Sequence, residues 1–103
     1  MRKFAIAMSE VQSDVVQTDV ELVDTLMEAQ KVAVDYLRER VGDFLDIDDD
    51  DPAATWEHRN RAVSERLTTE TSIFDSFYVE RYVWRCEDQG GLCVSATIQE
   101  VKV

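Results

Sequence analysis

The chain has 103 residues, enough for one domain built around a single hydrophobic core. Its 45% apolar residues, with only three glycines and one proline, exclude a wholly disordered or low-complexity protein. The 22 acidic and 11 basic residues give a formal net charge of −11, which excludes direct binding to nucleic acid or to anionic membranes. We therefore expect one domain over residues 1–103 and a protein partner with a basic surface.

The chain begins MRKFAIAMSEV, a basic start followed by a short apolar run. This run covers about five residues, fewer than the core of a signal peptide. No segment approaches the roughly 20 apolar residues of a membrane-spanning helix. We therefore expect no membrane contact, a cytoplasmic location and two cysteines that are thiols.

Residues 2–8 predict a short strand. Phe4, Ile6 and Met8 alternate with small alanines, so they would lie on one side of an extended chain. The following segment, residues 9–17, leaves two interpretations open. It either extends the strand or forms a connecting loop.

Residues 19–41 predict a long amphipathic helix. Thr18 and Glu21 have the spacing of a capping box, in which each side chain binds the backbone amide of the other. Gly42 is expected to end the helix in a left-handed conformation. The apolar side chains that recur at three- and four-residue steps are Leu22, Val23, Leu26, Met27, Ala33, Val34, Leu37 and Val41.

A second helix is predicted from Asp51 to about Thr68. Asp51 is suited to the N-cap, and Pro52 fits the first helical position, where a missing amide costs nothing. Trp56, Val63 and Leu67 supply its apolar stripe. Residues 43–51 then form an acidic linker between the two helices.

From Ile73 the pattern of β-branched and aromatic residues predicts a hairpin. Trp84 is expected opposite Ala96, and Tyr82 opposite Ile98, with a loop of Gln89, Gly90 and Gly91. The expected buried side chains of the two arms are Tyr82, Trp84, Cys86, Leu92, Val94, Ala96 and Ile98.

These elements predict an α+β fold in the order β-α-α-β-β. Its sheet would have three mostly antiparallel strands, with both helices on one face. The opposite face is then too apolar for full solvation and is a candidate surface for a homodimer or a partner. Its alternative is an ordinary half-solvated sheet face. The side chains expected there are Phe77, Val79, Arg81, Val83 and Arg85.

The acidic linker contains a weak calcium motif. Asp46, Asp48, Asp50 and Glu57 occupy the first, third, fifth and twelfth positions of a twelve-residue window, as in an EF-hand loop. The sixth position needs a left-handed turn, but it holds Asp51 followed by a proline. We therefore expect a solvated linker without a metal or another cofactor, and keep calcium binding as the alternative.

No catalytic motif is recognisable. His58 is the only histidine and has no nucleophile motif beside it. Cys86 and Cys93 would project to opposite faces of the hairpin, so neither a disulfide nor a metal site is expected. We therefore expect a protein that is not an enzyme.

Acidic residues form a stripe on the first predicted helix, opposite its apolar side. The linker carboxylates would extend this row, which could occupy a channel that normally holds a phosphate backbone. The alternative is the ordinary charged outer face of an amphipathic helix. The predicted partner-binding residues are Glu21, Asp24, Glu28, Asp35, Glu39, Asp46, Asp48, Asp49, Asp50 and Asp51.

In size, charge and lack of catalytic motifs, the chain resembles the small acidic inhibitors of phages, the anti-CRISPR and anti-restriction class. The resemblance covers composition and one helix face, so no functional residue is carried over. It implies a charge mimic that blocks the basic surface of a nucleic-acid-binding effector complex in the host cytoplasm. Two alternatives stay open: a structural or regulatory domain of a halophile, acidic for solubility, and a small enzyme with unrecognised carboxylates.

Overall fold

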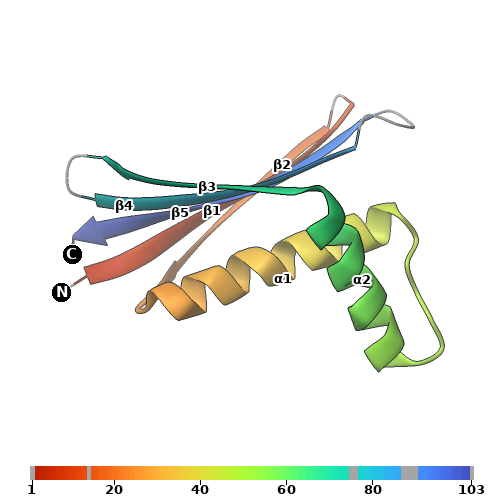
Figure 1. Cartoon of the computed structure of the whole chain (residues 1–103). Helices are drawn as coiled ribbons and strands as arrows, with labels where there is room; N and C mark the ends of the chain where they lie inside the picture. The colour runs from red at the N-terminus through yellow and green to blue at the C-terminus, as the bar shows by residue number, and fades with distance from the viewer. Residues whose placement is uncertain (1, 14, 75–76, 87–90, 103) are drawn as a thin grey trace.

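The computed structural model describes residues 2–13, 15–74, 77–86 and 91–102. Its core element is a five-stranded antiparallel sheet in the order β2-β1-β5-β4-β3, with both helices on the same side (Figure 1). None of the described helices is both long and apolar enough to cross a membrane. The elements are β1 (Arg2–Gln12), β2 (Val15–Val23), α1 (Leu26–Phe44), α2 (Pro52–Arg66), β3 (Leu67–Phe74), β4 (Phe77–Cys86) and β5 (Leu92–Lys102).

The predicted three-stranded sheet with the order β-α-α-β-β is therefore wrong. The observed order is β-β-α-α-β-β-β, because two strands were assigned to helices or loops. The first is β2, where Val15, Val16, Val20 and Val23 favour an extended chain, and β1 supplies the backbone partners. The second is β3, which begins in the last residues of the predicted second helix, continues through a segment for which no element was predicted, and pairs with β4.

The first helix begins later than predicted. Thr25, not Thr18, is its N-cap, and the Glu28 amide donates to the Thr25 hydroxyl oxygen at 3.1 Å. The Thr25 hydroxyl also donates to the Glu28 carboxylate, at 3.0 Å. Two capping-box spacings thus lie seven residues apart, and only the second starts a helix because β2 pairs with β1 through Val23.

The end of α1 also differs from the prediction. The helix continues through Gly42 to Phe44, and Asp46 takes the left-handed conformation with φ of 55°. The Ile47 amide donates to the Gly42 carbonyl oxygen at 2.9 Å, which closes the last turn. The second helix starts as predicted, with Asp51 as N-cap and Pro52 in the first turn.

The hairpin of β4 and β5 has a register two residues from the predicted one. Trp84 pairs with Val94, and Tyr82 pairs with Ala96. A shift of two residues keeps every side chain on its face, so the predicted buried set of the two arms is confirmed. Of the predicted loop, Gln89 and Gly90 lie outside the described residues, and Gly91 has a φ of +69°.

The hydrophobic core lies between the sheet and α1. Ala29, Ala33, Leu37 and Val41 recur every four residues, and all are fully buried against β1 and β5. The small alanines let the helix approach the sheet closely. Trp84 fills the space toward α2, where its indole nitrogen donates to the Ala62 carbonyl oxygen at 3.1 Å. The core therefore fixes α1 along the sheet beside β2.

One carboxylate is buried at the β4 side of this core. Glu80 accepts hydrogen bonds from the Gln30 amide at 3.2 and 3.3 Å, and from the Tyr78 hydroxyl. These donors replace the water that burial removes. The hydrogen bond to Glu80, with burial and the charge of the carboxylate, raises the pKa of Tyr78.

Candidate binding interface

A groove lies between β2 and α1 on the helix side of the sheet. Its volume is about 300 Å³. The lining combines four carboxylates with apolar and aromatic side chains: Met8, Asp19, Glu21, Val32, Asp35, Tyr36 and Glu39.

The register of the β1–β2 hairpin directs two carboxylates into the groove. Glu21 pairs with Ile6, and Asp19 pairs with Met8. Directly opposed residues of an antiparallel pair point to the same face of the sheet. Since Ile6 and Met8 are buried in the core beside α1, Asp19 and Glu21 also point to the helix side.

The other two carboxylates come from α1. Asp35 and Glu39 lie one turn apart, on the flank of the helix rather than on the stripe that faces the sheet. Val32 and Tyr36 lie between that buried stripe and the two carboxylates. The groove therefore has an apolar floor and an acidic rim.

Most of the groove carboxylates lack an ion pair. Asp35 pairs with Arg38, with a nitrogen–oxygen distance of 3.2 Å. Asp19, Glu21 and Glu39 have no lysine or arginine nitrogen within 4 Å in the described part of the chain. Their charges are therefore free to attract an external cation.

Arg40 lies beside the groove, but its guanidinium is already occupied. It donates to the Glu10 carboxylate and to the Gln17 amide oxygen, both at 3.4 Å, and lies 5.2 Å from the centre of the Tyr36 ring. Burial raises the pKa of Tyr36, Arg40 lowers it, and nearby carboxylates, Asp19 among them, raise it further. The net upward shift shows that burial and the carboxylates outweigh the arginine.

The predicted helical stripe comprised Glu21, Asp24, Glu28, Asp35 and Glu39. These residues do not share one helix face, because the first two precede α1. Asp24 pairs with Lys3 at 3.1 Å, and Glu28 is held by the Thr25 cap. The remaining three meet in the groove, on two different elements.

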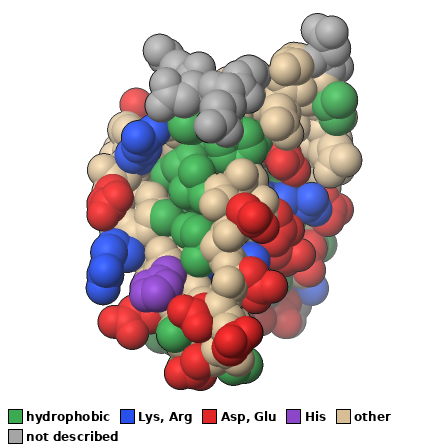
Figure 2. All heavy atoms as spheres, turned by 90° about the vertical axis from the view of Figure 1, so that its right-hand side faces the viewer, with side chains coloured by type: hydrophobic (Ala, Val, Ile, Leu, Met, Phe, Trp, Pro, Cys, Tyr) green, Lys and Arg blue, Asp and Glu red, His purple; other side chains and the backbone are tan. Residues whose placement is uncertain are grey.

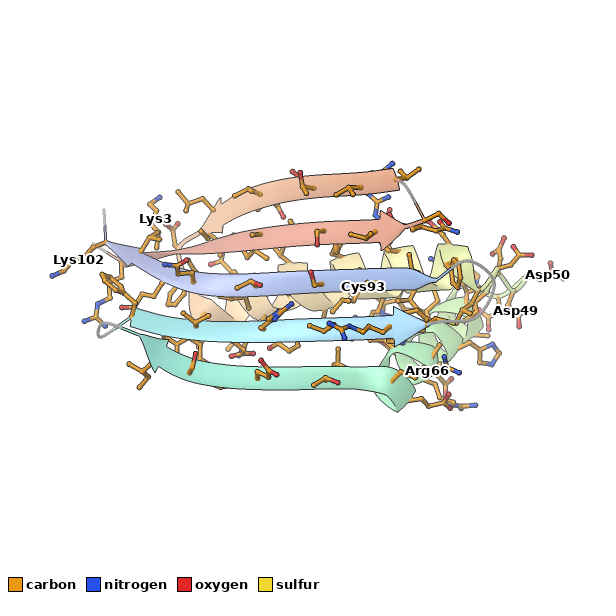
Figure 3. The ribbon with its side chains drawn as sticks, turned by 90° about the horizontal axis from the view of Figure 1, so that it is seen from above. Lys3, Asp49, Asp50, Arg66, Cys93 and Lys102 are labelled. Atoms are coloured by element: carbon orange, nitrogen blue, oxygen red, sulfur yellow. The ribbon has the colours of Figure 1, made fainter. Side chains whose placement is uncertain are left out.

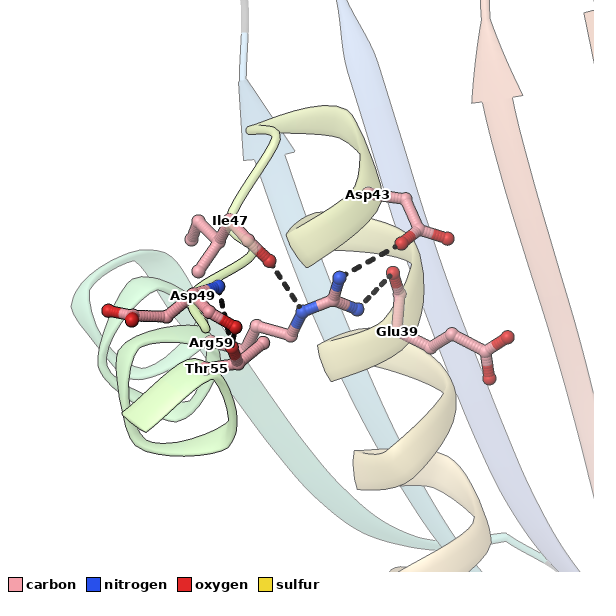
Figure 4. Close-up of polar contacts among 6 residues, drawn as sticks. All are labelled: Glu39, Asp43, Ile47, Asp49, Thr55 and Arg59. Atoms are coloured by element: carbon pink, nitrogen blue, oxygen red, sulfur yellow. Dashed lines mark hydrogen bonds and ion pairs between the residues drawn. The ribbon is translucent and has the colours of Figure 1, made fainter. Parts of the chain in front are cut away.

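The acidic linker is anchored by Arg59 of α2 (Figure 4). The guanidinium donates to the Ile47 carbonyl oxygen at 3.0 Å, to the Asp43 carboxylate at 3.1 Å and to the Glu39 carbonyl oxygen at 3.4 Å. A Cβ at Gly42 would lie 2.5 Å from the Arg59 side chain, so the glycine makes room for it. The linker is thereby tied to the end of α1.

A second set of hydrogen bonds holds the linker to the first turn of α2. The Asp49 amide donates to the Thr55 hydroxyl oxygen at 2.7 Å, and that hydroxyl donates to the Asp49 carbonyl oxygen at 3.1 Å. The Ala53 amide donates to the Asp51 carboxylate at 3.0 Å. The linker side chains that stay exposed are Asp46, Asp48, Asp49, Asp50 and Asp51.

The calcium alternative concerned Asp46, Asp48, Asp50 and Glu57. Asp46 lies just beyond the end of α1, whereas Glu57 lies inside α2. Over residues 2–13, 15–74, 77–86 and 91–102, no group of three or more His, Cys, Asp or Glu side chains is arranged to hold a metal ion.

The outer face of the sheet has a different chemistry. Figure 3 looks onto it and shows the five strands side by side, with the helices behind them. Arg66, Arg81 and Arg85 line a shallow hollow of about 180 Å³ there, with Glu70 as its acidic member. This hollow is therefore mainly basic, in contrast to the acidic rim of the groove on the helix side. The candidate dimer residues lie on this outer side: Phe77, Val79, Arg81, Val83 and Arg85.

The end of the molecule near α2 carries an apolar hollow. It has a volume of about 230 Å³ and is lined by Phe44, Leu45, Trp84 and Cys86, among others. Figure 2 views this end, with hydrophobic side chains in the middle and acidic side chains along one side and the bottom. Cys86 and Cys93 are both thiols. Because Cys93 pairs with Arg85, the two thiols project to opposite faces.

Comparisons with known proteins do not assign a family. No family model matches the chain, and no curated protein or solved structure is significantly similar to it.

Asp19 is the groove residue that sequence reasoning missed. It was placed in the first turn of the predicted helix, where it had no special role. The signal that could have found it is the alternation of Val16, Thr18, Val20 and Leu22 with polar residues, which is typical of a strand.

Proposed function

We propose that this protein is a non-enzymatic inhibitor that docks its acidic surface on a basic nucleic-acid-binding surface of a protein partner. The acidic surface consists of the groove carboxylates and the linker aspartates, residues 46 and 48–51. The observation that carries the proposal is the gathering of Asp19, Glu21 and Glu39 in one groove, where none of the three has a cationic partner among the described residues. The location would be the cytoplasm, and the host cytoplasm if the protein is encoded by a phage.

The electrostatics of the groove favour a cationic partner. Like charges that face each other across a groove repel, and the repulsion lowers the stability of the free protein. Lysine or arginine side chains from a partner would relieve this repulsion and release bound counterions. In this mechanism carboxylates take the place of phosphates, so nucleic acid and the inhibitor compete for one surface.

The rigidity of the acidic surface also supports this function. The core fixes α1 beside β2, and Arg59 fixes the linker to the end of α1. A partner would therefore meet carboxylates that are already in place, and binding would cost little conformational entropy.

The test begins with capture of the partner from a lysate of the source cell and its identification by mass spectrometry. The purified partner is then bound to a fluorescent nucleic acid, and release of the nucleic acid is followed as the inhibitor is added. We expect the wild-type protein to displace the nucleic acid, with an affinity that weakens steeply as salt is raised. A partner that binds the inhibitor and nucleic acid at the same time would contradict the proposal.

Two matched triple variants locate the surface. The groove variant carries Asp19→Lys, Glu21→Lys and Glu39→Lys, and we expect at least a 100-fold loss of affinity. The control variant carries Glu57→Lys, Glu65→Lys and Glu70→Lys. Three changes from −1 to +1 raise the net charge from −11 to −5 in both variants. Equal losses in the two variants would mean that net charge, not the groove, drives binding.

A further inference from the structure

The outer edge of β2 has no partner among the described strands, because β2 is the first strand in the sheet order. Such an edge presents backbone N–H and C=O groups that another extended chain can bind. Eight of the nine side chains of the strand are exposed, and the ninth, Val23, is half-buried. The edge is therefore accessible along its whole length.

The side chains of β2 separate by chemistry onto its two faces. On the outer face of the sheet lie Val16, Val20 and Leu22, which are 62%, 67% and 56% exposed. On the helix side lie Asp19 and Glu21, at the rim of the acidic groove. An occupant of this edge would therefore meet aliphatic side chains on one face and carboxylates on the other.

We propose that an extended segment of the partner adds to the edge of β2 as a sixth strand, with lysine or arginine at alternate positions and aliphatic side chains between them. The inference rests on the proposed function, because it names the segment of the partner that enters the acidic groove. The basic side chains face Asp19 and Glu21, and the aliphatic side chains pack beside Val16, Val20 and Leu22.

The dimensions of a sheet suit this arrangement. A sixth strand lies about 4.8 Å beyond β2, and its side chains lie about 5 Å from those directly opposite. Lysine and arginine have long flexible stems, so their charged groups can also approach Asp35 and Glu39 on the flank of α1. Each basic residue would therefore find carboxylates from both elements.

Charge decides against a second copy of this chain as the occupant. Pairing two β2 edges would bring Asp19 and Glu21 of one copy beside the same residues of the other. Like charges opposite each other in a sheet are destabilising, and each copy carries a net charge of −11. A basic partner strand has the opposite sign at those positions.

Four eight-residue peptides with the same side chains test the proposal, the last two being the two phases of one N-methylated design. The first alternates lysine and valine. The second has four valines followed by four lysines. The third and fourth have the alternating sequence with backbone N-methyl groups on every second residue, one peptide in each phase, which removes hydrogen-bond donors but keeps the charge. Affinity is measured by fluorescence anisotropy at low salt.

We expect the alternating peptide to bind at least tenfold more tightly than the block peptide, and one N-methyl phase to lose at least tenfold. Its binding should also fall at least tenfold in the groove variant and less than twofold in the control variant. Equal affinities for all peptides, with loss in the groove variant, would overturn strand addition and leave charge docking intact. Equal binding by the groove variant would count against the proposed function itself. A wild-type dimer in sedimentation that Val20→Lys abolishes would assign the edge to a second copy and overturn the inference.

Discussion

The two edges of the sheet present the same backbone but different side chains. β2 combines the exposed aliphatic residues Val16, Val20 and Leu22 with carboxylates, and α1 packs beside it. β3 instead carries mainly exposed threonine and serine side chains, with Ile73 as its exposed aliphatic residue, and its Glu70 lies opposite Arg81 of β4 in the ladder. This difference is the reason why the proposed partner strand is assigned to the edge of β2 rather than to the edge of β3.

Among changes that test the difference between the two edges, the largest effect is expected from making β2 resemble β3. The triple variant Val16→Thr, Val20→Thr and Leu22→Thr should weaken partner binding by roughly 10- to 100-fold, because each cross-strand aliphatic contact contributes about 0.5–1 kcal/mol. These side chains are exposed, so the melting temperature should stay nearly unchanged. Calorimetric titration measures the affinity. Unchanged affinity would show that the aliphatic face of β2 takes no part.

Arg59→Ala tests whether binding in the groove depends on the anchoring of the linker. The change removes three hydrogen bonds of a charged group, so we expect the free energy of unfolding to fall by about 1–3 kcal/mol. Denaturant titration measures the loss, with Arg61→Ala on the exposed side of α2 as the control. The β2 groove does not depend on these bonds. Binding of the alternating peptide should therefore stay within about twofold of wild type.

Two tyrosines report the electrostatic potential at two places on the helix side of the sheet: Tyr36 lines the groove beside β2, and Tyr78 lies at the β4 side of the core. Nearby carboxylates help to raise the pKa of Tyr36, so Glu39→Lys should lower that pKa. The pKa of Tyr78 is raised mainly by its hydrogen bond to Glu80 and should not respond to this change. A carbon-13 NMR titration of the tyrosine rings measures both values. An unchanged pKa of Tyr36 in the Glu39→Lys variant would contradict the electrostatic account of the groove.

The same shift has a consequence for stability. A pKa raised above 10.0 means that the folded state holds the Tyr36 proton more tightly than the unfolded state does. The contribution of the protonated Tyr36 to the free energy of unfolding is fully present below pH 10. It is lost as pH rises through the folded pKa, with a slope of at most about 1.4 kcal/mol per pH unit. Tyr36→Phe should remove this part of the alkaline loss in denaturant titrations. An identical alkaline slope in the variant would be inconsistent with the raised pKa.

The smallest effect is expected from making β3 resemble β2. The changes Thr68→Val, Ser72→Val, Thr69→Asp and Thr71→Glu place aliphatic and acidic side chains on alternate faces of that edge. These four changes are added to the groove variant. The alternating peptide should bind the combined variant less than about threefold more tightly than it binds the groove variant alone. The reason is that Asp35 and Glu39 of α1 lie beside β2. Full recovery of affinity would show that a strand alone makes the site.

Local sequence signals were sufficient where they had no competitor. Asp51 and Pro52 marked the start of α2, and the alternation in Leu92, Val94 and Ala96 marked the buried face of β5. Each of these patterns depends on residues within one element. They could therefore be interpreted without knowledge of distant partners.

The misassigned strands depended on pairing with a neighbouring strand, because β2 forms a hairpin with β1 and β3 forms one with β4. Thr18 with Glu21 and Thr25 with Glu28 have the same spacing, and only the pairing of β2 with β1 distinguishes them. β3 is rich in threonine, which is tolerated in a helix but favoured in a strand next to β4. The tertiary pairing outweighs a weak local preference in both cases.

The candidate site was predicted in composition but not in shape. Glu21, Asp35 and Glu39 were named for a helical row, and they meet because a strand and a helix pack together. Asp24 and Glu28 are not part of the groove, because Asp24 pairs with Lys3 and Glu28 is held by the Thr25 cap. A groove between two elements cannot be inferred until both elements are correctly assigned.

Amide hydrogen exchange in the complex with the partner is the most direct test of the β2 groove as the binding surface. We predict that binding slows exchange at residues 15–23 at least tenfold, because a new strand would bind the free edge. Exchange at residues 67–74 should stay unchanged, since the partner is not expected to bind β3. Protection of β3 or of the outer face of β4, with β2 unchanged, would contradict the account.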